Sequence, residues 1–216
     1  MPPSTHPSQA PPRPRSPAAP GARRPTSDRI LDAALAQFGR RGYEATSLDA
    51  LAAELGLTKQ AILYWFPSKE ALLDAVVVRS ADDLRVALEG ALAGTPPGFG
   101  RVETVMATVF RFAVRRPALL GLVREANRLG PEVAARMEAG VSPLVRRAID
   151  FLADEMDAGT IRRADPRLLL LFMYATVVGV ATEVEVQRAV GLVSSPGALR
   201  QLRRELFAFV RAAVTA

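Results

Sequence analysis

The sequence SLDALAAELGLTKQAILYWF, residues 47–66, is the most informative stretch for the fold of this chain. It predicts two short helices that meet at Gly56, because glycine tolerates the positive φ that a tight turn needs. The small Ala52 lets two steeply crossing helices approach, and the branched Ile62 can fix the second helix on the first. The pattern predicts a helix-turn-helix whose second helix can lie in a DNA major groove, with an ordinary pair of packed helices as the alternative.

The rest of the chain also has helical patterning. From Ser27 onward apolar residues recur at helical spacing, and glycine and proline fall mainly between the segments. Ser27 or Asp28 can cap the first helix, and Gly140 and Pro143 mark a possible kink in the seventh. We expect nine helices and no strands, at residues 28–41, 48–55, 58–66, 69–93, 101–115, 118–129, 132–157, 166–190 and 196–214.

This layout predicts an all-α chain in three parts. A proline- and arginine-rich leader is followed by a three-helix helix-turn-helix domain and by a helical bundle, at residues 1–26, 27–74 and 75–216. The leader holds nine of the 17 prolines and four arginines without an acidic residue, at positions Arg13, Arg15, Arg23 and Arg24. We expect the leader to be disordered, either as an arm that reaches DNA or as a solubilising tail.

Composition argues against several classes of enzyme. The 216 residues include no cysteine, and the only histidine, His6, lies in the leader. This excludes a thiol nucleophile and a cysteine-ligated metal, and it leaves the folded part without a histidine for a Ser-His-Asp triad. Glycine-rich phosphate-binding and nucleophile-elbow motifs are also missing from the sequence. We therefore expect no enzyme activity, no metal and no cofactor.

Hydropathy predicts a cytoplasmic protein without a membrane anchor. Residues 1–25 contain no apolar run of the kind found in secretory signals. The longest apolar stretch, residues 168–181, is shorter than the roughly 20 residues of a membrane-spanning helix. The formal charge is +6, which is compatible with nucleic-acid binding without establishing it.

Several motifs in register resemble the TetR/AcrR family of bacterial transcriptional regulators. They are RILDAALAQF at 29–38, GYEATS at 42–47, LAAELG at 51–56 and FPSKEAL at 66–72. The resemblance covers about residues 27–75. Beyond it only the helical layout and the chain length match. It implies a homodimer that binds a palindromic operator in double-stranded DNA.

The resemblance also implies DNA contacts at matching positions. The helix at 58–66 would be the recognition helix, with Lys59, Gln60 and Ala61 facing bases at its exposed start. Lysine suits the acceptor edge of guanine and glutamine suits adenine. Hydroxyl groups near the start of the second helix suit a phosphate. The expected DNA-binding residues are Thr46, Ser47, Thr58, Lys59, Gln60, Ala61, Tyr64 and Lys69.

One segment departs from the family pattern. Where the family usually has Leu-Tyr-x-His-Phe, this chain has Ile-Leu-Tyr-Trp-Phe at residues 62–66. Leu63 therefore stands at the usual tyrosine position and Trp65 at the usual histidine position. We expect Tyr64 to take over the phosphate contact, and Trp65 to pack against the first and fourth helices.

Charge sets a further condition on DNA binding. Residues 27–74 contain five basic residues and seven acidic ones, a net charge of −2. The basic ones are Arg29, Arg40, Arg41, Lys59 and Lys69. Affinity would have to come from the placement of a few cations, from helix N-termini and from the arginine-rich leader.

The C-terminal bundle predicts a dimer. Residues 168–181 are apolar on every side of a helix, which requires burial on every side. The last helix carries an apolar stripe at Leu199, Leu202, Leu206, Phe209 and Ala213. In the resembling family the last two helices form a four-helix interface between subunits. Packing within one subunit is the alternative.

The remaining helices could enclose a hydrophobic small-molecule effector. The candidate lining residues are Met106, Phe110, Asn127, Met137, Phe172, Met173, Tyr174 and Thr176. Methionine suits variable apolar ligands, although the same residues at helical spacing also suit a plain core. We therefore expect a ligand-responsive repressor. The alternatives are an activator or global regulator without an effector, and a helical enzyme or adaptor that has lost DNA binding.

Overall fold

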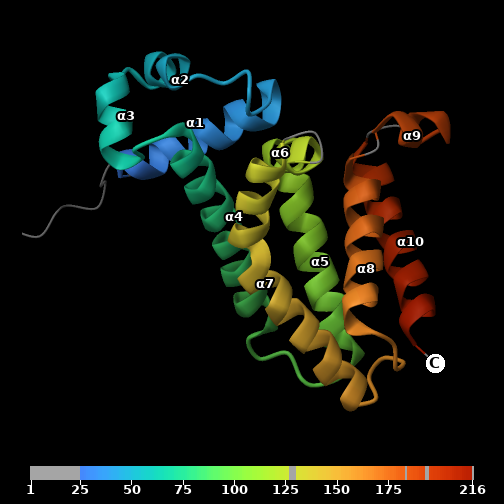
Figure 1. The fold of residues 1–216 in the computed structure, drawn as a ribbon. Helices are drawn as coiled ribbons and strands as arrows, with labels where there is room; N and C mark the ends of the chain where they lie inside the picture. The colour runs from blue at the N-terminus through green and yellow to red at the C-terminus, as the bar shows by residue number, and fades with distance from the viewer. Residues whose placement is uncertain (1–24, 127–129, 183, 193–194, 216) are drawn as a thin grey trace, which may run out of the picture.

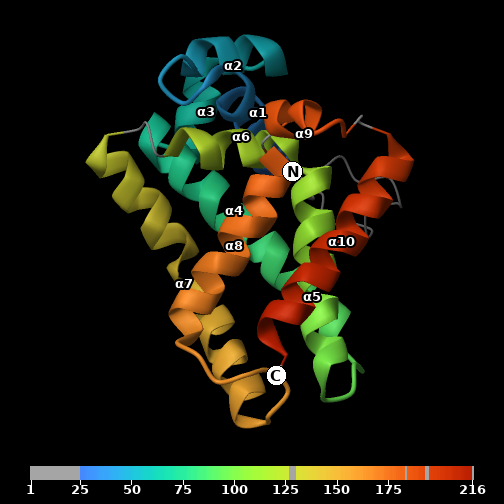
Figure 2. The ribbon, with the colours of Figure 1, turned by 90° about the vertical axis from the view of Figure 1, so that its right-hand side faces the viewer.

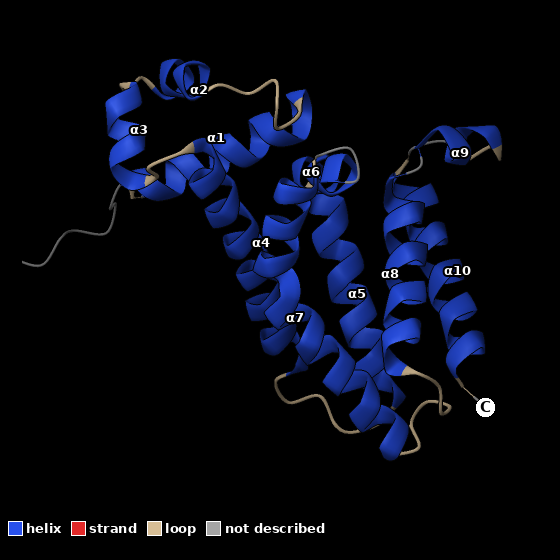
Figure 3. Cartoon of the chain, in the orientation of Figure 1, coloured by secondary structure: helices blue, strands red, loops and turns tan. Residues whose placement is uncertain are grey.

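The computed structural model describes residues 25–126, 130–182, 184–192 and 195–215, and within these ranges the chain is helical without a strand (Figure 3). The helices are α1 Thr26–Arg41, α2 Leu48–Leu55, α3 Lys59–Trp65, α4 Lys69–Leu92, α5 Phe99–Arg115, α6 Pro117–Ala126, α7 Pro131–Asp157, α8 Pro166–Thr182, α9 Val184–Ala189 and α10 Pro196–Val214. The all-α prediction is therefore confirmed. No helix of the described residues is both long enough and apolar enough for a membrane crossing.

The helices form two groups joined by α4. Figure 1 shows α1, α2 and α3 together at one end of the molecule, with α4 running from them into a bundle that contains α5, α7, α8 and α10. Helix α6 lies across the bundle end and packs against α1 (Figures 1 and 2). The N-terminal group therefore contacts the bundle through both α4 and α6.

A continuous apolar core holds the N-terminal group together. Ile30 and Phe38 of α1, Leu51 of α2, Ile62 of α3 and Leu72 of α4 are buried in one cluster. The apolar face predicted for α1 is confirmed by this packing. Burying a side chain of this size contributes roughly 1.5–3 kcal/mol. These contacts fix α3 relative to α1 and α4.

A second core lies between α5, α7, α8 and α10. Val102, Leu152, Val177, Leu206 and Val214 are buried there. Each of these helices is long enough to contribute several turns to the cluster. The bundle is thus packed around its own core, separate from that of the N-terminal group.

The start of the first helix and the helix predicted over 166–190 differ from the sequence prediction. Helix α1 begins at Thr26, and its N-cap Pro25 makes no side-chain cap bond. The helix predicted over 132–157 is confirmed as α7, which continues through Pro143. The helix predicted over 166–190 is divided into α8 and α9, with residue 183 outside the described residues. The Gln187 side chain donates to the carbonyl oxygen of Val180 at 2.6 Å, so a side chain satisfies this carbonyl near the end of α8.

Candidate nucleic-acid interface

The turn between α2 and α3 is held by backbone hydrogen bonds. Gly56 has φ 65° and ψ 34°, the left-handed conformation that glycine adopts without strain. The Leu57 N–H donates to the Ala52 carbonyl at 2.9 Å, and the Gly56 N–H donates to the Ala53 carbonyl at 3.3 Å. This pairing is a Schellman motif, which satisfies carbonyls at the end of α2. It confirms the glycine turn that the sequence predicts.

Side-chain caps fix where α2 and α3 begin. The Ser47 hydroxyl accepts from the Ala50 N–H at 3.1 Å, and the Thr58 hydroxyl accepts from the Ala61 N–H at 3.1 Å. Such caps typically stabilise a helix by about 1 kcal/mol. The first turn of α3 is therefore an ordered element on the surface.

The outward face of α3 carries the residues predicted to meet bases. Thr58, Lys59 and Gln60 are exposed and Ala61 is partly buried, while Ile62 is fully buried behind them. The structure thus places these predicted residues on one accessible turn. Their contact with DNA stays a prediction.

Two aromatic side chains extend this face toward the end of α3. Tyr64 is 81% exposed, and Trp65 lies edge-on against it with ring centroids 5.5 Å apart. Trp65 is 47% exposed, so it packs less than the sequence predicts. Phe66 packs against the core instead, since the chain turns there toward α4. Trp65 is therefore an addition to the accessible surface that the sequence interpretation missed.

Thr46 does not lie on the accessible surface. It is buried, and its hydroxyl donates to the Gly42 carbonyl at 2.8 Å. Its backbone N–H donates to the Tyr43 carbonyl at 3.2 Å. Both donors are used within the protein, so the structure contradicts a phosphate contact from Thr46 in this conformation. Ser47 is exposed and remains a candidate for that contact.

Lys69 connects the start of α4 to the segment between α1 and α2. Its ammonium nitrogen donates to the Glu44 carbonyl at 3.2 Å and lies 4.3 Å from the centroid of the Tyr43 ring. The Tyr43 hydroxyl donates to Glu70 Oε1 at 3.4 Å. Burial first, and then the negative charge of Glu70, raises the pKa of Tyr43 to about 12. Lys69 is thus a positioned cation beside the predicted phosphate site.

Asp49 is a residue of this surface that the sequence interpretation did not select. Its carboxylate lies in the first turn of α2, and its Oδ2 accepts from the Lys59 ammonium at 2.8 Å. Ten positions separate these residues in sequence, and the turn at Gly56 brings them together. Sequence spacing alone gives no signal for this pair.

The predicted effector-pocket residues do not form one site within the described part of the chain. Met106 and Phe110 are buried in the bundle core, and Met173 packs against the same core. Met137 packs against the N-terminal core instead. A cavity lined jointly by these side chains is thus not supported, because the two cores are separate.

The other pocket candidates lie elsewhere. Phe172 and Tyr174 are exposed on α8, and the Thr176 hydroxyl donates to the Phe172 carbonyl at 2.7 Å. Asn127 lies outside the described residues. The residues of α8 are apolar on every side, so the sequence does not reveal which side of the helix faces the bundle. The sequence prediction therefore placed exposed residues of α8 in a pocket.

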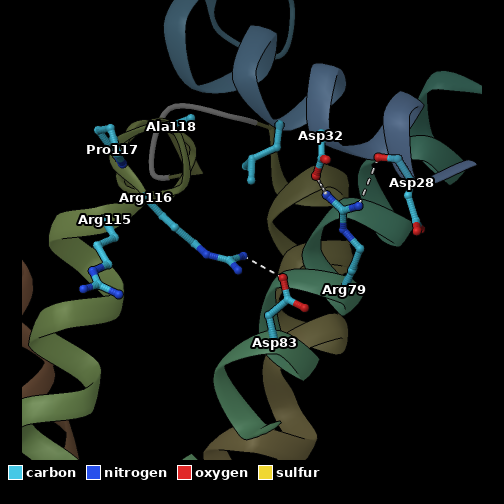
Figure 4. Close-up of a pocket in the computed structure, with 9 residues that line it drawn as sticks. Asp28, Asp32, Arg79, Asp83, Arg115, Arg116, Pro117 and Ala118 are labelled. Carbon is cyan, nitrogen blue, oxygen red and sulfur yellow. Dashed lines mark hydrogen bonds and ion pairs between the residues drawn. The ribbon is translucent and has the colours of Figure 1, made fainter. Parts of the chain in front are cut away.

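Two surface clefts in the described residues are lined by both charged and apolar groups. One, of about 480 Å³, lies between α1, α4 and the corner joining α5 to α6 (Figure 4). There Arg79 donates to Asp32 Oδ1 at 2.5 Å and Arg116 donates to Asp83 Oδ2 at 2.7 Å. The other, of about 730 Å³, lies between α5 and α10. Neither cleft includes a predicted pocket residue.

Comparison with known proteins identifies the N-terminal group. A family model described as "Bacterial regulatory proteins, tetR family" matches residues 30–76, from α1 into α4. A relative from Bacillus subtilis (strain 168), the HTH-type transcriptional regulator YhgD, is 24% identical over 162 residues, which are 73% of this chain and 83% of the relative. Residues 30–76 of this chain belong to the TetR family.

Solved structures extend the likeness over most of the chain. FadR from Bacillus subtilis, in complex with stearoyl-CoA, aligns with a TM-score of 0.71 at 16% identity, covering 85% of this chain and 96% of FadR. AibR, in complex with isovaleryl coenzyme A and operator DNA, aligns with a TM-score of 0.67 at 19% identity, covering 85% and 97%. At these identities the likeness is one of fold. The bundle of this chain therefore shares the helical fold of these two proteins, as the DNA-binding end does.

Proposed function

We propose that this TetR-family regulator is a repressor that binds a palindromic operator as a homodimer and releases it in response to a ligand, without enzyme activity. The observation that carries the proposal is the exposed first turn of α3, where Lys59 and Gln60 stand on a capped helix fixed against a buried core. Such a helix start can enter a major groove. We assign DNA binding to residues 27–74, the bundle to 75–216 and an accessory role to the leader at 1–26.

The dimer is supported by an apolar face that the single chain leaves exposed. Leu168, Leu171 and Phe172 lie on the outer face of α8, and Phe172 is 62% exposed. Phe209 of α10 is 64% exposed. Figure 2 shows α8 and α10 together on the side that faces the viewer. Large apolar patches of this kind favour association, and a two-fold dimer would present two recognition helices about 34–36 Å apart.

A ligand response is supported by the way the bundle meets the DNA-binding helices. Helix α4 runs from α3 into the bundle, and α6 packs against α1. A change in bundle packing would therefore alter the placement of α3. A ligand can shift this equilibrium only through its different affinities for the two states. The acyl-CoA complexes of FadR and AibR support an effector with an apolar part, as the sequence predicts.

A regulator without an effector is the second candidate. Burial of Met106 and Phe110 in the bundle core favours it, because these residues were expected to line a pocket. The two candidates differ in their response to added ligand. Stearoyl-CoA and isovaleryl-CoA are suitable first probes. A concentration-dependent rise in Tm together with release of bound DNA would support the responsive repressor. If the two ligands cause neither effect, the second candidate is favoured for these ligand classes.

DNA binding itself is tested by footprinting on genomic fragments, beginning with DNA upstream of the protein's own gene. We expect a protected palindrome whose half-sites are about one helical turn or more apart. The double substitution Lys59→Ala with Gln60→Ala should abolish sequence preference while the helical fold remains. Arg200→Ala with Gln201→Ala, a matched exposed pair on α10, should leave the footprint unchanged. Equal loss in both variants would contradict the assignment.

A further inference from the structure

The ion pair between Asp49 and Lys59 crosses the helix-turn-helix at the surface proposed to meet DNA. Lys59 is the first residue of α3, and Asp49 lies in the first turn of α2. The ammonium nitrogen and the carboxylate oxygen are 2.8 Å apart, with the side chains 47% and 68% exposed. The pair is therefore formed by the free protein and remains accessible to a nucleic acid.

A lysine held in this way differs from a mobile one. Its ammonium has three N–H donors, of which Asp49 takes one, so two remain for other acceptors. A guanine edge offers two acceptors in the major groove. A phosphate has to approach the same ammonium against the charge of the adjacent carboxylate. The pair therefore favours hydrogen bonding at a base edge over general attraction to the DNA backbone.

Other cations near this surface are also engaged by the protein. Lys69 donates to the Glu44 carbonyl, and Arg29 donates to the Leu55 carbonyl at 3.4 Å. The domain as a whole carries two more acidic than basic residues over 27–74. Non-specific attraction to phosphates is thus weak in this domain. Pairing of Lys59 with Asp49 therefore has a proportionally large effect on that attraction.

We infer that Asp49 is a positioning residue that sets DNA selectivity, by holding Lys59 toward base edges and lowering its attraction to phosphates. The inference rests on the proposed function, since it requires the start of α3 to face DNA. Asp49 acts through Lys59, so its effect on selectivity must disappear when the lysine is removed.

The ion pair can be tested in the free protein. The chain contains only two lysines, Lys59 and Lys69, so lysine-selective NMR labelling gives two side-chain ammonium signals. Lys59→Met identifies the Lys59 signal by removing it. We expect Asp49→Asn to shift the Lys59 signal and to leave that of Lys69 in place. An unchanged Lys59 signal would overturn the inference, because the pair would not exist in solution.

The effect on selectivity is measured as the ratio of affinities for two duplexes. These are the operator fragment recovered by footprinting and a shuffled duplex of equal length, each titrated at several salt concentrations. With Asp49→Asn, Lys59 can neutralise one further phosphate of the shuffled duplex. Its salt slope should steepen by about 0.9, and the selectivity ratio should fall by about threefold.

A double-mutant cycle separates this role from simple charge removal. In the Lys59→Met background, Asp49→Asn should change both affinities by the same factor. Glu44→Gln is the matched control, because Glu44 is exposed and makes no ion pair among the described residues. It should leave the selectivity ratio unchanged.

The outcomes distinguish the two levels of the proposal. Selective binding with an unchanged ratio in Asp49→Asn, or an equal fall in Glu44→Gln, would overturn the role of Asp49 alone. If the unaltered protein binds both duplexes equally, the proposed function and the role of Asp49 fail together.

Discussion

Gly39 of α1 and Gly121 of α6 meet backbone to backbone, so that a Cβ atom added to Gly121 would overlap the carbonyl oxygen of Gly39. A Cβ on Gly39 would in turn overlap the backbone of Ala118. The two helices can approach this closely only because neither glycine has a side chain. The contact joins the DNA-binding group to the bundle independently of α4.

This contact predicts a large effect from a single methyl group. Gly121→Ala should lower the free energy of unfolding by about 1–3 kcal/mol, as expected for overpacking at a close contact. Denaturation in urea measures this change. Gly90→Ala, on α4 with open space around it, is the matched control and should be neutral or stabilising by up to about 1 kcal/mol. Equal effects of the two substitutions would contradict the packing argument.

The raised pKa of Tyr43 predicts that the folded protein loses stability in alkaline solution. The folded chain raises its pKa from 10.0 to about 12, so folding favours the neutral phenol. The stabilisation is therefore complete below about pH 10 and is lost as the pH rises toward 12. Tyr43→Phe should flatten this part of the curve of unfolding free energy against pH. Tyr64→Phe, at an exposed ring, should retain the alkaline loss, and identical curves for both variants would contradict the assignment.

The exposed face of α8 predicts how the dimer is disrupted. Phe172→Glu should weaken association by more than tenfold, because a buried interface aromatic typically contributes about 2 kcal/mol or more. Sedimentation across a concentration series measures the change, and circular dichroism checks that the helices remain. Val86→Glu, at an exposed apolar residue of α4, is the control and should leave association unaltered. An unchanged dimer in Phe172→Glu would place the interface elsewhere.

The arginine-rich leader predicts part of the salt dependence of DNA binding. Residues 1–24, which lie outside the described residues, contain four arginines and no acidic side chain. Their deletion should weaken DNA binding. It should also reduce the slope of log K against log salt by about 0.9 for every DNA phosphate that the leader neutralises. Binding titrations at several salt concentrations give this slope. An identical slope would mean that the leader does not bind DNA.

Local signals in the sequence were sufficient for the helix-turn-helix. Caps at Ser47 and Thr58 and the glycine at position 56 depend on nearby residues, and the structure has all three as expected. The small Ala52 and the branched Ile62 also occupy the buried positions that their spacing predicts. Hydrogen bonds between near neighbours and helical periodicity are short-range properties, which a sequence displays directly.

Tertiary packing settled what these local signals left open. It buried Thr46 while exposing Ser47, left Trp65 half exposed and placed Met106 in the core. These outcomes depend on which distant helix lies against each residue, and periodicity does not specify that neighbour. The helices and their turn could thus be predicted from the chain alone. The approach of Asp49 to Lys59 and of Gly39 to Gly121 could not, because the angles between packed helices set those distances.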